Sequence, residues 1–412
     1  MRNKTAVFLA MFVLVATGAW AGTEKVLWNF GGVSADGSSP FGSDLATDGA
    51  GNLYGITASG GTYGSGVVFE LSPNEQGGYD ETLLYEFTGG SDGANPNGGL
   101  VFDGRGNLYG ATYGGGAYGY GTVFELSPNG MNWEETVIYS FGGTGGDGNN
   151  PSTAGVVFDT HGNLYGTTSV GGGSGDGTVF ELSPSGGGWT ETILHSFDST
   201  DGNILFSPVM VDAAGNVFGT TELGGAYNWG TVFELVRTRA GWEEKVLHSF
   251  GAPSGDGIEP NAVKLISDQN GNIYGTTYLA VAGCCGFYAS GTVWELVYSQ
   301  ATRSYSYEIL HAFQVPGDGG LAFGGVAMDR LGNLYGVTRR GGAYGGGIVY
   351  RLTRSGSGWN YGIDYSFTSG TDGGEPTGNL LIDNMHIYGM TNRGGAYIGS
   401  GFGAGVVFEV TP

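Results

Sequence analysis

One five-residue phrase, Gly-Asn-Leu-Tyr-Gly, returns along the chain at a nearly constant interval and limits the possible folds more than any other feature. A phrase related to Gly-Thr-Val-Phe-Glu-Leu follows each copy, and an apolar segment that ends in Phe also occurs seven times. Repeats of about 40–50 residues made of short strands are typical of propeller blades. The seven copies, some of them altered, lie 53 to 61 residues apart and begin at Gly51, Gly106, Gly162, Gly215, Gly271, Gly332 and Met385.

Each repeat contains four short segments with strand character, separated by turn signals. In the second repeat these are 99–103, 107–112, 122–127 and 135–141. An Asp-x-x-Gly turn joins the first two, and its Asp is placed to accept a backbone N–H two residues on, as in a hairpin. Calcium binding is the rival interpretation of the repeated Asp, but the further oxygen ligands of a calcium loop are missing.

The order of the phrases predicts how the ring closes. The Phe-ending segment occurs once before the first Gly-Asn phrase, at Val26–Phe30, and is absent after Glu409 in the last repeat. The N-terminal strand can therefore supply the fourth strand of the last blade. We predict an all-β protein, a seven-bladed β-propeller with four-stranded antiparallel blades, in which the N-terminal strand joins the last blade and residues 22–412 form a single domain.

Composition agrees with a β fold and excludes one class of partner. Of the 412 residues, 86 are Gly, and each Gly inside a helix costs roughly 1 kcal/mol. The chain is 40% hydrophobic, which is enough to build a large core. Lys and Arg number 15 against 38 Asp and Glu, a formal net charge of −23. This acidic balance excludes nucleic acid as an expected partner, because its phosphate backbone is anionic.

The N-terminal residues have the pattern of a transport signal. Arg2 and Lys4 precede an unbroken apolar run of eleven residues, and Ala19 and Ala21 place small side chains where a signal peptidase reads. We predict that 1–21 is a signal peptide cleaved after Ala21, and that the protein is secreted, extracellular or at the cell surface. The apolar run is shorter than the ~20 residues that a membrane helix needs, so we expect no membrane span.

Two longer phrases resemble a known family. Gly-Asn-Leu-Tyr-Gly-x-Thr and Gly-Gly-x-Tyr-Gly-x-Gly-Thr-Val-Phe-Glu-Leu are similar to the GloVer tandem repeat, found in exported bacterial proteins described as having a choice of anchor. The resemblance extends over all seven repeats. It implies an exported repeat protein without an assigned biochemical activity. Because the sequence ends inside its last repeat, at Val406–Pro412, we expect no C-terminal anchor of that kind.

Several polar positions recur in every repeat, but the predicted geometry keeps them apart. Equivalent outer-strand positions of adjacent blades would lie on the order of 18 Å apart, whereas zinc–imidazole bonds measure about 2 Å. We therefore interpret His195, His248 and His311 as structural aromatic residues with a polar tip. One Glu per third strand is too dispersed for paired carboxyl catalysis. We expect no catalytic residue, no metal and no cofactor, and classify the chain as a non-enzyme.

Positions where the repeats differ are better candidates for ligand contacts. A Thr recurs at the end of the second strand, while the residues that follow it vary and include three Arg on adjacent blades. Cys284 and Cys285 are neighbours in an insertion of the fifth repeat, and their redox state stays open. The candidate ligand-binding residues are Tyr113, Glu222, Tyr278, Arg339, Arg340, Asn392 and Arg393, and the candidate channel-mouth residues are Asp44, Lys264 and Asn379.

These features favour one function and leave two alternatives open. The hypothesis is an exported, monomeric binding or surface-interaction propeller for an extracellular glycan or protein. The first alternative is an enzyme that acts on extracellular polysaccharide through an asymmetric site around Asp44 and Lys264. The second is a purely structural envelope component.

Overall fold

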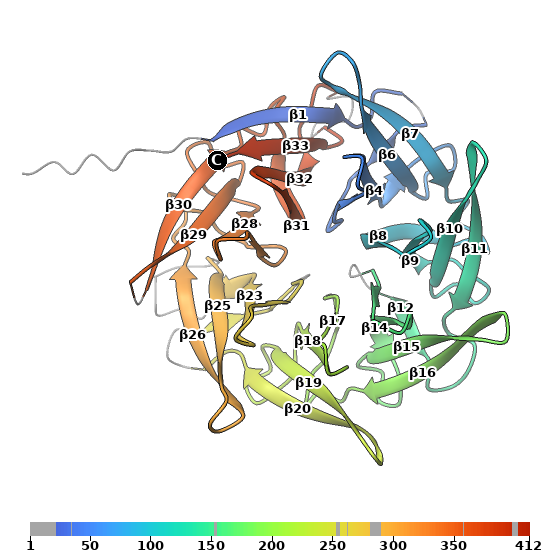
Figure 1. The fold of residues 1–412 in the computed structure, drawn as a ribbon, viewed down its shortest axis with the longest axis vertical. Helices are drawn as coiled ribbons and strands as arrows, with labels where there is room; N and C mark the ends of the chain where they lie inside the picture. The colour runs from blue at the N-terminus through green and yellow to red at the C-terminus, as the bar shows by residue number, and fades with distance from the viewer. Residues whose placement is uncertain are drawn as a thin grey trace, which may run out of the picture.

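The computed structural model is a seven-bladed β-propeller in which each blade is a four-stranded antiparallel sheet (Figure 1). It describes residues 22–412 except 34, 152–154, 253–255, 262, 281–289, 357 and 398–402. Across these residues there are strands, turns and loops but no helix, and therefore none that could cross a membrane. The predicted all-β propeller with four-stranded antiparallel blades is thus confirmed, while the predicted signal segment 1–21 lies outside the described residues.

The first three blades follow the order of the repeats, from the inner strand outward. Blade 1 consists of β3 (Ala46–Thr47), β4 (Leu53–Thr57), β6 (Val67–Pro73) and β7 (Tyr79–Glu86). Blade 2 consists of β8 (Ala94–Phe102), β9 (Leu108–Gly114), β10 (Thr122–Asn129) and β11 (Asn132–Ser140). Blade 3 has a divided inner strand and consists of β12 (Gly148–Pro151), β13 (Val157–Phe158), β14 (Leu164–Gly171), β15 (Thr178–Ser185) and β16 (Gly188–Ser196).

Blades 4 to 6 repeat the pattern, and two short strand pairs extend blades 1 and 5. Blade 4 consists of β17 (Met210–Val211), β18 (Val217–Thr221), β19 (Thr231–Thr238) and β20 (Gly241–Ser249). Blade 5 consists of β22 (Ile266–Ser267), β23 (Ile273–Thr277), β25 (Thr292–Ser299) and β26 (Ser304–Ala312). Blade 6 consists of β27 (Ala327–Met328), β28 (Leu334–Thr338), β29 (Ile348–Ser355) and β30 (Gly358–Ser366). The added pairs are β2 (Gly37–Ser38) with β5 (Ser59–Gly60) and β21 (Gly257–Ile258) with β24 (Leu279–Ala280).

Blade 7 combines strands from the two ends of the described chain (Figure 1). Its inner three strands are β31 (Gly374–Asp383), β32 (His386–Arg393) and β33 (Val406–Thr411). The outer strand is β1 (Thr23–Asn29), which runs antiparallel to β33, so that Thr23 lies opposite Thr411 and Asn29 opposite Val406. Blade 7 therefore has the same number of strands as the other blades.

The Gly that ends the Gly-Asn-Leu-Tyr-Gly phrase is explained by an aromatic ring on the neighbouring strand. Gly110 on β9 pairs with Phe124 on β10, and a Cβ at Gly110 would lie 2.6 Å from Cζ of that ring. The same approach, at 2.5 Å, occurs between Gly166 and Phe180. Only Gly leaves room for the ring at this position. The seven third-strand rings are 0% exposed and belong to Phe69, Phe124, Phe180, Phe233, Trp294, Tyr350 and Phe408.

The Phe that ends each outer strand joins one blade to the next. Each packs against the buried third-strand ring of the following blade, with ring centroids 5.0–5.7 Å apart, mostly edge-on. Aromatic pairs of this kind add about 0.5–1.5 kcal/mol beyond the burial of their surface. The pairs are Phe30–Phe69, Phe87–Phe124, Phe141–Phe180, Phe197–Phe233, Phe250–Trp294, Phe313–Tyr350 and Phe367–Phe408.

The repeated Asp-x-x-Gly segment forms the predicted turn. Oδ1 of Asp103 accepts backbone N–H groups of Arg105 at 2.8 Å and Asn107 at 2.9 Å. Oδ2 accepts the side-chain amide of Asn107 at 3.0 Å. Asp48, Asp159, Asp212, Asp268 and Asp329 repeat these contacts. Since the turn itself supplies donors to both oxygens, it accounts for the repeated Asp without a bound ion.

We predict that Gly110→Ala destabilises the fold, because its methyl group would overlap the ring of Phe124. The expected loss is about 1–3 kcal/mol in the free energy of unfolding, as for an overpacked core, measured by denaturant titration. Gly104→Ala is the matched control, since a Cβ there meets no atom within 4 Å. Combining Gly110→Ala with Phe124→Leu is expected to cost less than the sum of the two changes. Equal effects of Gly110→Ala and Gly104→Ala would contradict this explanation.

Candidate functional site

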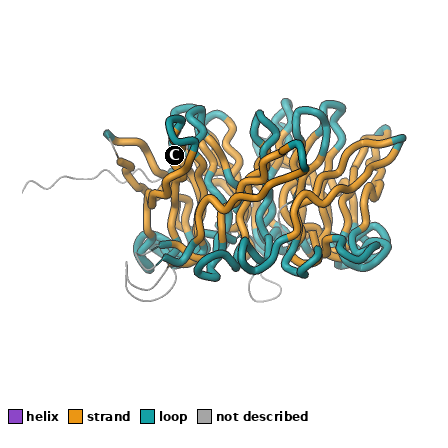
Figure 2. The backbone as a smooth tube through the Cα atoms, turned by 90° about the horizontal axis from the view of Figure 1, so that it is seen from below, coloured by secondary structure: helices purple, strands orange, loops and turns teal. Residues whose placement is uncertain are grey.

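The loops that enter the inner strands and those that join second to third strands emerge at one end of the disc. We call this end the loop face, represented in blade 2 by residues 88–93 and 115–121, and the opposite end, with turns such as 103–106, the turn face. Figure 2 shows the two ends of the disc from the side, with strands between two layers of loops. All candidate ligand-binding residues lie at the end of a second strand or directly after it, and therefore belong to the loop face.

We call the boundary between two adjacent blades a blade seam. On the loop face a strained backbone position recurs at each of these seams. Seven non-Gly residues, one in each inner-strand entry, have left-handed φ values of 51–58°, a conformation that costs L-residues roughly 1–2 kcal/mol. The N–H groups of six of them bond to carbonyls of the preceding blade, as from Asn95 to Ser65 at 2.9 Å and from Glu375 to Gly346 at 2.8 Å. The seven residues are Ser39, Asn95, Asn150, Ile204, Glu259, Leu321 and Glu375.

In several seams the side chain at this strained position reaches the variable position of the preceding blade. In the first two seams the contact is structural, because the amides of Asn95 and Asn150 donate to the backbone carbonyls of Ala58 and Tyr113. In blade 7 the position is occupied by Glu375, whose carboxylate meets the side chain of Arg339 from blade 6. The same seam geometry thus gives a hydrogen bond from a side chain to the backbone in some blades and an ion pair in another.

Glu375 gathers the three predicted arginines. Its Oε2 lies 2.7 Å from Nη2 of Arg339, and its Oε1 lies 3.1 Å from Nη1 of Arg393 and 3.9 Å from Nη2 of Arg340. The side chain of Glu375 is 11% exposed, while those of Arg340 and Arg393 are 62% and 41% exposed. Three guanidinium groups around one carboxylate leave a local excess of two positive charges on an acidic chain.

Besides its ion pair with Glu375, the guanidinium group of Arg339 lies against two aromatic rings. Its guanidinium carbon lies 5.5 Å from the ring centroid of Phe41 and 5.7 Å from that of Phe323. These two rings are 4.9 Å apart, although they come from the entry loops of blades 1 and 6. Tyr278 approaches Phe323 edge-on at 6.0 Å. Arg339 is therefore held in place, and Arg340 and Arg393 are the cations that reach solvent.

The other predicted ligand-binding residues lie at separate seams. Oδ1 of Asn392 accepts the hydroxyl of Ser39 at 3.0 Å. Oε1 of Glu222 accepts the amide of Asn261 at 3.0 Å, and the pKa of Glu222 is raised, first by burial and then by the charge of Glu259. Tyr113 is 40% exposed in blade 2. The structure thus groups Tyr278 and the three arginines around blades 5 to 7, and leaves Asn392, Glu222 and Tyr113 at other seams.

The predicted channel-mouth residues lie along the inner strands. The backbone N–H of Asn379 donates to Oδ1 of Asp44 at 2.7 Å, and its side-chain amide contacts both carboxylate oxygens at 2.9 and 3.0 Å. Oδ1 of Asn379 accepts the N–H of Gly325, and a Cβ at Gly325 would touch the carbonyl of Lys264, whose side chain is exposed. Asp44 is thus engaged by Asn379, which argues against its use as an acid or base.

The recurring His and Glu have the structural partners expected of them. Nε2 of His195, His248 and His311 lies 2.9–3.1 Å from an Asp of the following loop. Tyr85, Tyr139 and Tyr365 make the equivalent bond through their hydroxyls at 3.1–3.2 Å. The third-strand Glu accept hydroxyl donors, as Glu125 does from Ser127 at 2.9 Å. Among the described residues no three His, Cys, Asp or Glu side chains gather to hold a metal, and Cys284 and Cys285 lie outside them.

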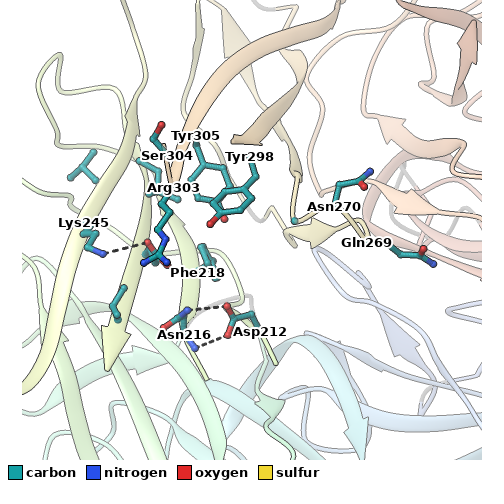
Figure 3. Close-up of a pocket in the computed structure, with 15 residues that line it drawn as sticks. Asp212, Asn216, Phe218, Lys245, Gln269, Asn270, Tyr298, Arg303, Ser304 and Tyr305 are labelled. Atoms are coloured by element: carbon teal, nitrogen blue, oxygen red, sulfur yellow. Dashed lines mark hydrogen bonds and ion pairs between the residues drawn. The ribbon is translucent and has the colours of Figure 1, made fainter. Parts of the chain in front are cut away.

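Pockets on the turn face follow from the blade repeat. One of about 670 Å³ lies between blades 4 and 5 and is lined by Asp212, Asn216, Lys245, Arg303 and Tyr305, among others (Figure 3). Nζ of Lys245 lies 4.0 Å from a carboxylate oxygen of Glu234. Comparable pockets at other seams are lined by the equivalent turn residues Asp103, Asp159 and Asp329. This recurrence assigns the pockets to the architecture rather than to one specific ligand.

Sequence reasoning missed Glu375, Phe41, Phe323 and Glu259. The available signal was their place in the entry loop, since Glu259 and Glu375 each directly precede a Pro, as Asn95 and Asn150 do. Without the ring geometry, nothing showed that this residue contacts the variable position of the preceding blade.

Comparison with known proteins agrees with the repeat. Residues 16–212 match the model of the Gloeobacter/Verrucomicrobia repeat family, which confirms the resemblance to GloVer repeats. No curated protein matches the chain.

Several solved structures resemble this chain at low sequence identity. A putative 6-phosphogluconolactonase from Bacteroides uniformis is 15% identical, with coverage of 82% of this chain and 88% of that one and a TM-score of 0.50. The PQQ-bound aldose sugar dehydrogenase from Streptomyces coelicolor is 14% identical, with coverage of 95% and 99% and a TM-score of 0.45. A protein of unknown function from Dyadobacter fermentans is 11% identical, with coverage of 94% and 98% and a TM-score of 0.45. At these identities the likeness concerns the fold alone.

We predict that Glu375→Gln destabilises the protein by about 1–3 kcal/mol, because it removes the carboxylate beneath three guanidinium groups and leaves partly buried donors unsatisfied. Urea unfolding at low ionic strength measures the loss, which added salt is expected to reduce by screening the repulsion among the arginines. Arg340→Gln is the control, since its exposed contact at 3.9 Å is worth less than about 1 kcal/mol. A loss from Glu375→Gln no larger than that of Arg340→Gln would refute the clustering role.

Proposed function

We propose that this chain is an exported, monomeric binding module whose ligand site is the arginine cluster of the loop face. The observation that carries the proposal is the arrangement around Glu375, where one buried carboxylate holds two solvent-reaching guanidinium groups on adjacent blades. A fold needs no such local excess of positive charge for its stability. Guanidinium groups bind carboxylates in paired, directional hydrogen bonds, so the expected ligand carries carboxylates.

Exposed tyrosines that follow two of these arginines in the sequence favour a glycan over other anionic ligands. In blades 6 and 7 the sequence Arg-Gly-Gly-Ala-Tyr places Tyr344 and Tyr397 four residues after Arg340 and Arg393. The two tyrosines are 68% and 50% exposed. Aromatic rings offer a flat apolar face and a polar hydroxyl, which suits the C–H face and hydroxyl groups of a sugar ring. Together with the cations of the same face, this chemistry fits an extracellular polysaccharide that contains uronic acids.

Export is part of the proposal and is supported by the signal-like residues 1–21. A positive start, a short apolar run and small residues before the expected cleavage site form the pattern of a signal peptide. Outside the cell such a module meets polysaccharides directly.

One observation favours the alternative of a polysaccharide-active enzyme. Glu222 and Glu259 belong to the same seam of the loop face, and the pKa of each is raised, with burial as the leading cause for both. A general acid with a raised pKa beside a second carboxyl group is what glycoside hydrolysis requires. Under this alternative the purified chain would cleave the polysaccharides that it binds, and Glu222→Gln would abolish cleavage while leaving binding intact.

We predict that Arg340→Ala and Arg393→Ala each weaken binding to a soluble polyuronate at least about tenfold, a loss of roughly 1.4 kcal/mol, and that the double variant is weaker still. Isothermal titration at 50 and 300 mM salt measures the affinity, which is expected to fall with salt. Arg330→Ala removes the same charge from an exposed position on the turn face and is expected to bind like the parent. Unchanged affinity in the Arg340 and Arg393 variants would discard this site.

A further inference from the structure

Away from the candidate site, every blade seam contains a pair of titratable side chains. The outer strand of each blade places one of them six residues before its final Phe, where it faces an Asp from the entry loop that follows the preceding outer strand. In chain order the pairs are Glu24–Asp372, Glu81–Asp36, Glu135–Asp92, Glu191–Asp147, Glu244–Asp201, Tyr307–Asp256 and Tyr361–Asp318. Five of the seven seams therefore oppose two carboxyl groups.

The seam between blades 1 and 2 shows the arrangement. Asp92 accepts the N–H and hydroxyl of Thr88 at 2.7 and 2.6 Å and the hydroxyl of Tyr85 at 3.2 Å. Opposite, Oε1 of Glu135 is buried and has no hydrogen-bond partner among the described residues. The ion pairs of the described chain include no Lys, Arg or His with Glu135. The seam thus places two acidic groups opposite each other, and no basic side chain among the described residues forms an ion pair with Glu135.

The other four Glu repeat this condition. Oε1 of Glu24, Glu81, Glu191 and Glu244 is likewise buried without a partner in the part of the chain that the structure describes. In the remaining two seams the position is Tyr, and the rings of Tyr307 and Tyr361 stack on His248 and His311 with centroids 3.9 Å apart. Because blades 5 and 6 do without the acid, the fold does not require Glu here.

We propose that each of the five Glu–Asp seams holds one proton between its two carboxyl groups, and that the ring is thereby locked more firmly in weakly acidic than in alkaline solution. A neutral Glu donates its O–H to the facing carboxylate, which supplies the missing partner of the buried oxygen. Loss of this proton leaves two like charges in a partly buried seam, where their repulsion is stronger than in water.

The direction of the pH effect follows from the carboxyl groups. Burial, and then the charge of Asp92, raises the pKa of Glu135 from 4.5 to about 7, and burial raises the pKa of Glu81 to about 8. Since the folded chain binds these protons more tightly than the unfolded chain, their contribution to stability is complete below about pH 4.5. It is lost progressively above that pH and is gone once the pH exceeds the folded pKa values of about 7 to 8.

Two seams isolate this effect from other groups that titrate. Glu135 faces Asp92, whose pKa is lowered by its hydrogen bonds against the effect of burial, and Tyr85, whose pKa is raised. Glu191 faces Asp147 and Tyr139, whose pKa is also raised. The seam of Glu244 also contains His195 and is therefore left unchanged in the test.

The test is thermal unfolding of the full chain between pH 5 and 9. The parent is expected to lose melting temperature as the pH rises from about 5 to about 8, and to level off above that. In the double variant Glu135→Gln/Glu191→Gln, the amides donate to Asp at every pH, so the decline is expected to shrink by about two fifths, as two of five pairs are removed. The exposed neighbours Glu134 and Glu243 lie on the same kind of strand, and Glu134→Gln/Glu243→Gln is expected to keep the parental decline.

A second measurement keeps the proposal falsifiable if the variants fold poorly. Carbon-13 NMR of the Glu side-chain carboxyl carbons in the parent chain is expected to show resonances that titrate near pH 7 and move to a Glu value near 4.5 on unfolding. Titration of all Glu near pH 4.5 in the folded chain would overturn the proposal, as would an identical decline in the parent and the seam variant. Restoration of the parental melting temperature at pH 8.5 by millimolar Ca²⁺, but not in the seam variant, would also overturn it, since the seams would then hold a cation.

Discussion

The contact between a strand-borne glycine and the ring beside it sets the shape of every blade. At Gly110 the absence of a side chain lets Phe124 lie across the sheet, and the same ring receives Phe87 from the blade before. One aromatic residue thus packs the blade internally and joins it to its neighbour. Because the contact recurs at all seven seams, including Phe30 against Phe69, the ring is held by a closed series of equivalent interfaces rather than by one core.

The repetition of one packing contact at every seam explains why so much of the fold was predictable from the sequence. A repeat that buries an aromatic ring at the same position seven times must also repeat its glycine and its turn residues. These phrases can be recognised in the amino-acid sequence alone. Gly110 and Asp103 are examples, since each is explained by atoms only a few positions away in its own blade. The recurring histidines likewise have a partner close in the sequence, as His195 has in Asp201.

The candidate site was less predictable because it depends on contacts between blades. Arg339 and Glu375 are 36 positions apart, and they meet only when blade 7 is set beside blade 6. Phe41 and Phe323 are more distant still, yet their rings lie 4.9 Å apart. Variation after the recurring Thr identified one partner of each seam pair. The other partner, on the strained entry residue, required the ring geometry, because the same position holds Asn in blades 2 and 3 for a purely local purpose.

The pairing of β1 with β33 also fixes an orientation. Thr23 lies opposite Thr411 at the turn face, whereas Asn29 and Val406 lie at the end of the sheet nearest the arginines. Residues 22 and 412 are therefore both on the side of the disc away from Glu375. A support joined at either position would leave the arginine cluster on the opposite side of the disc.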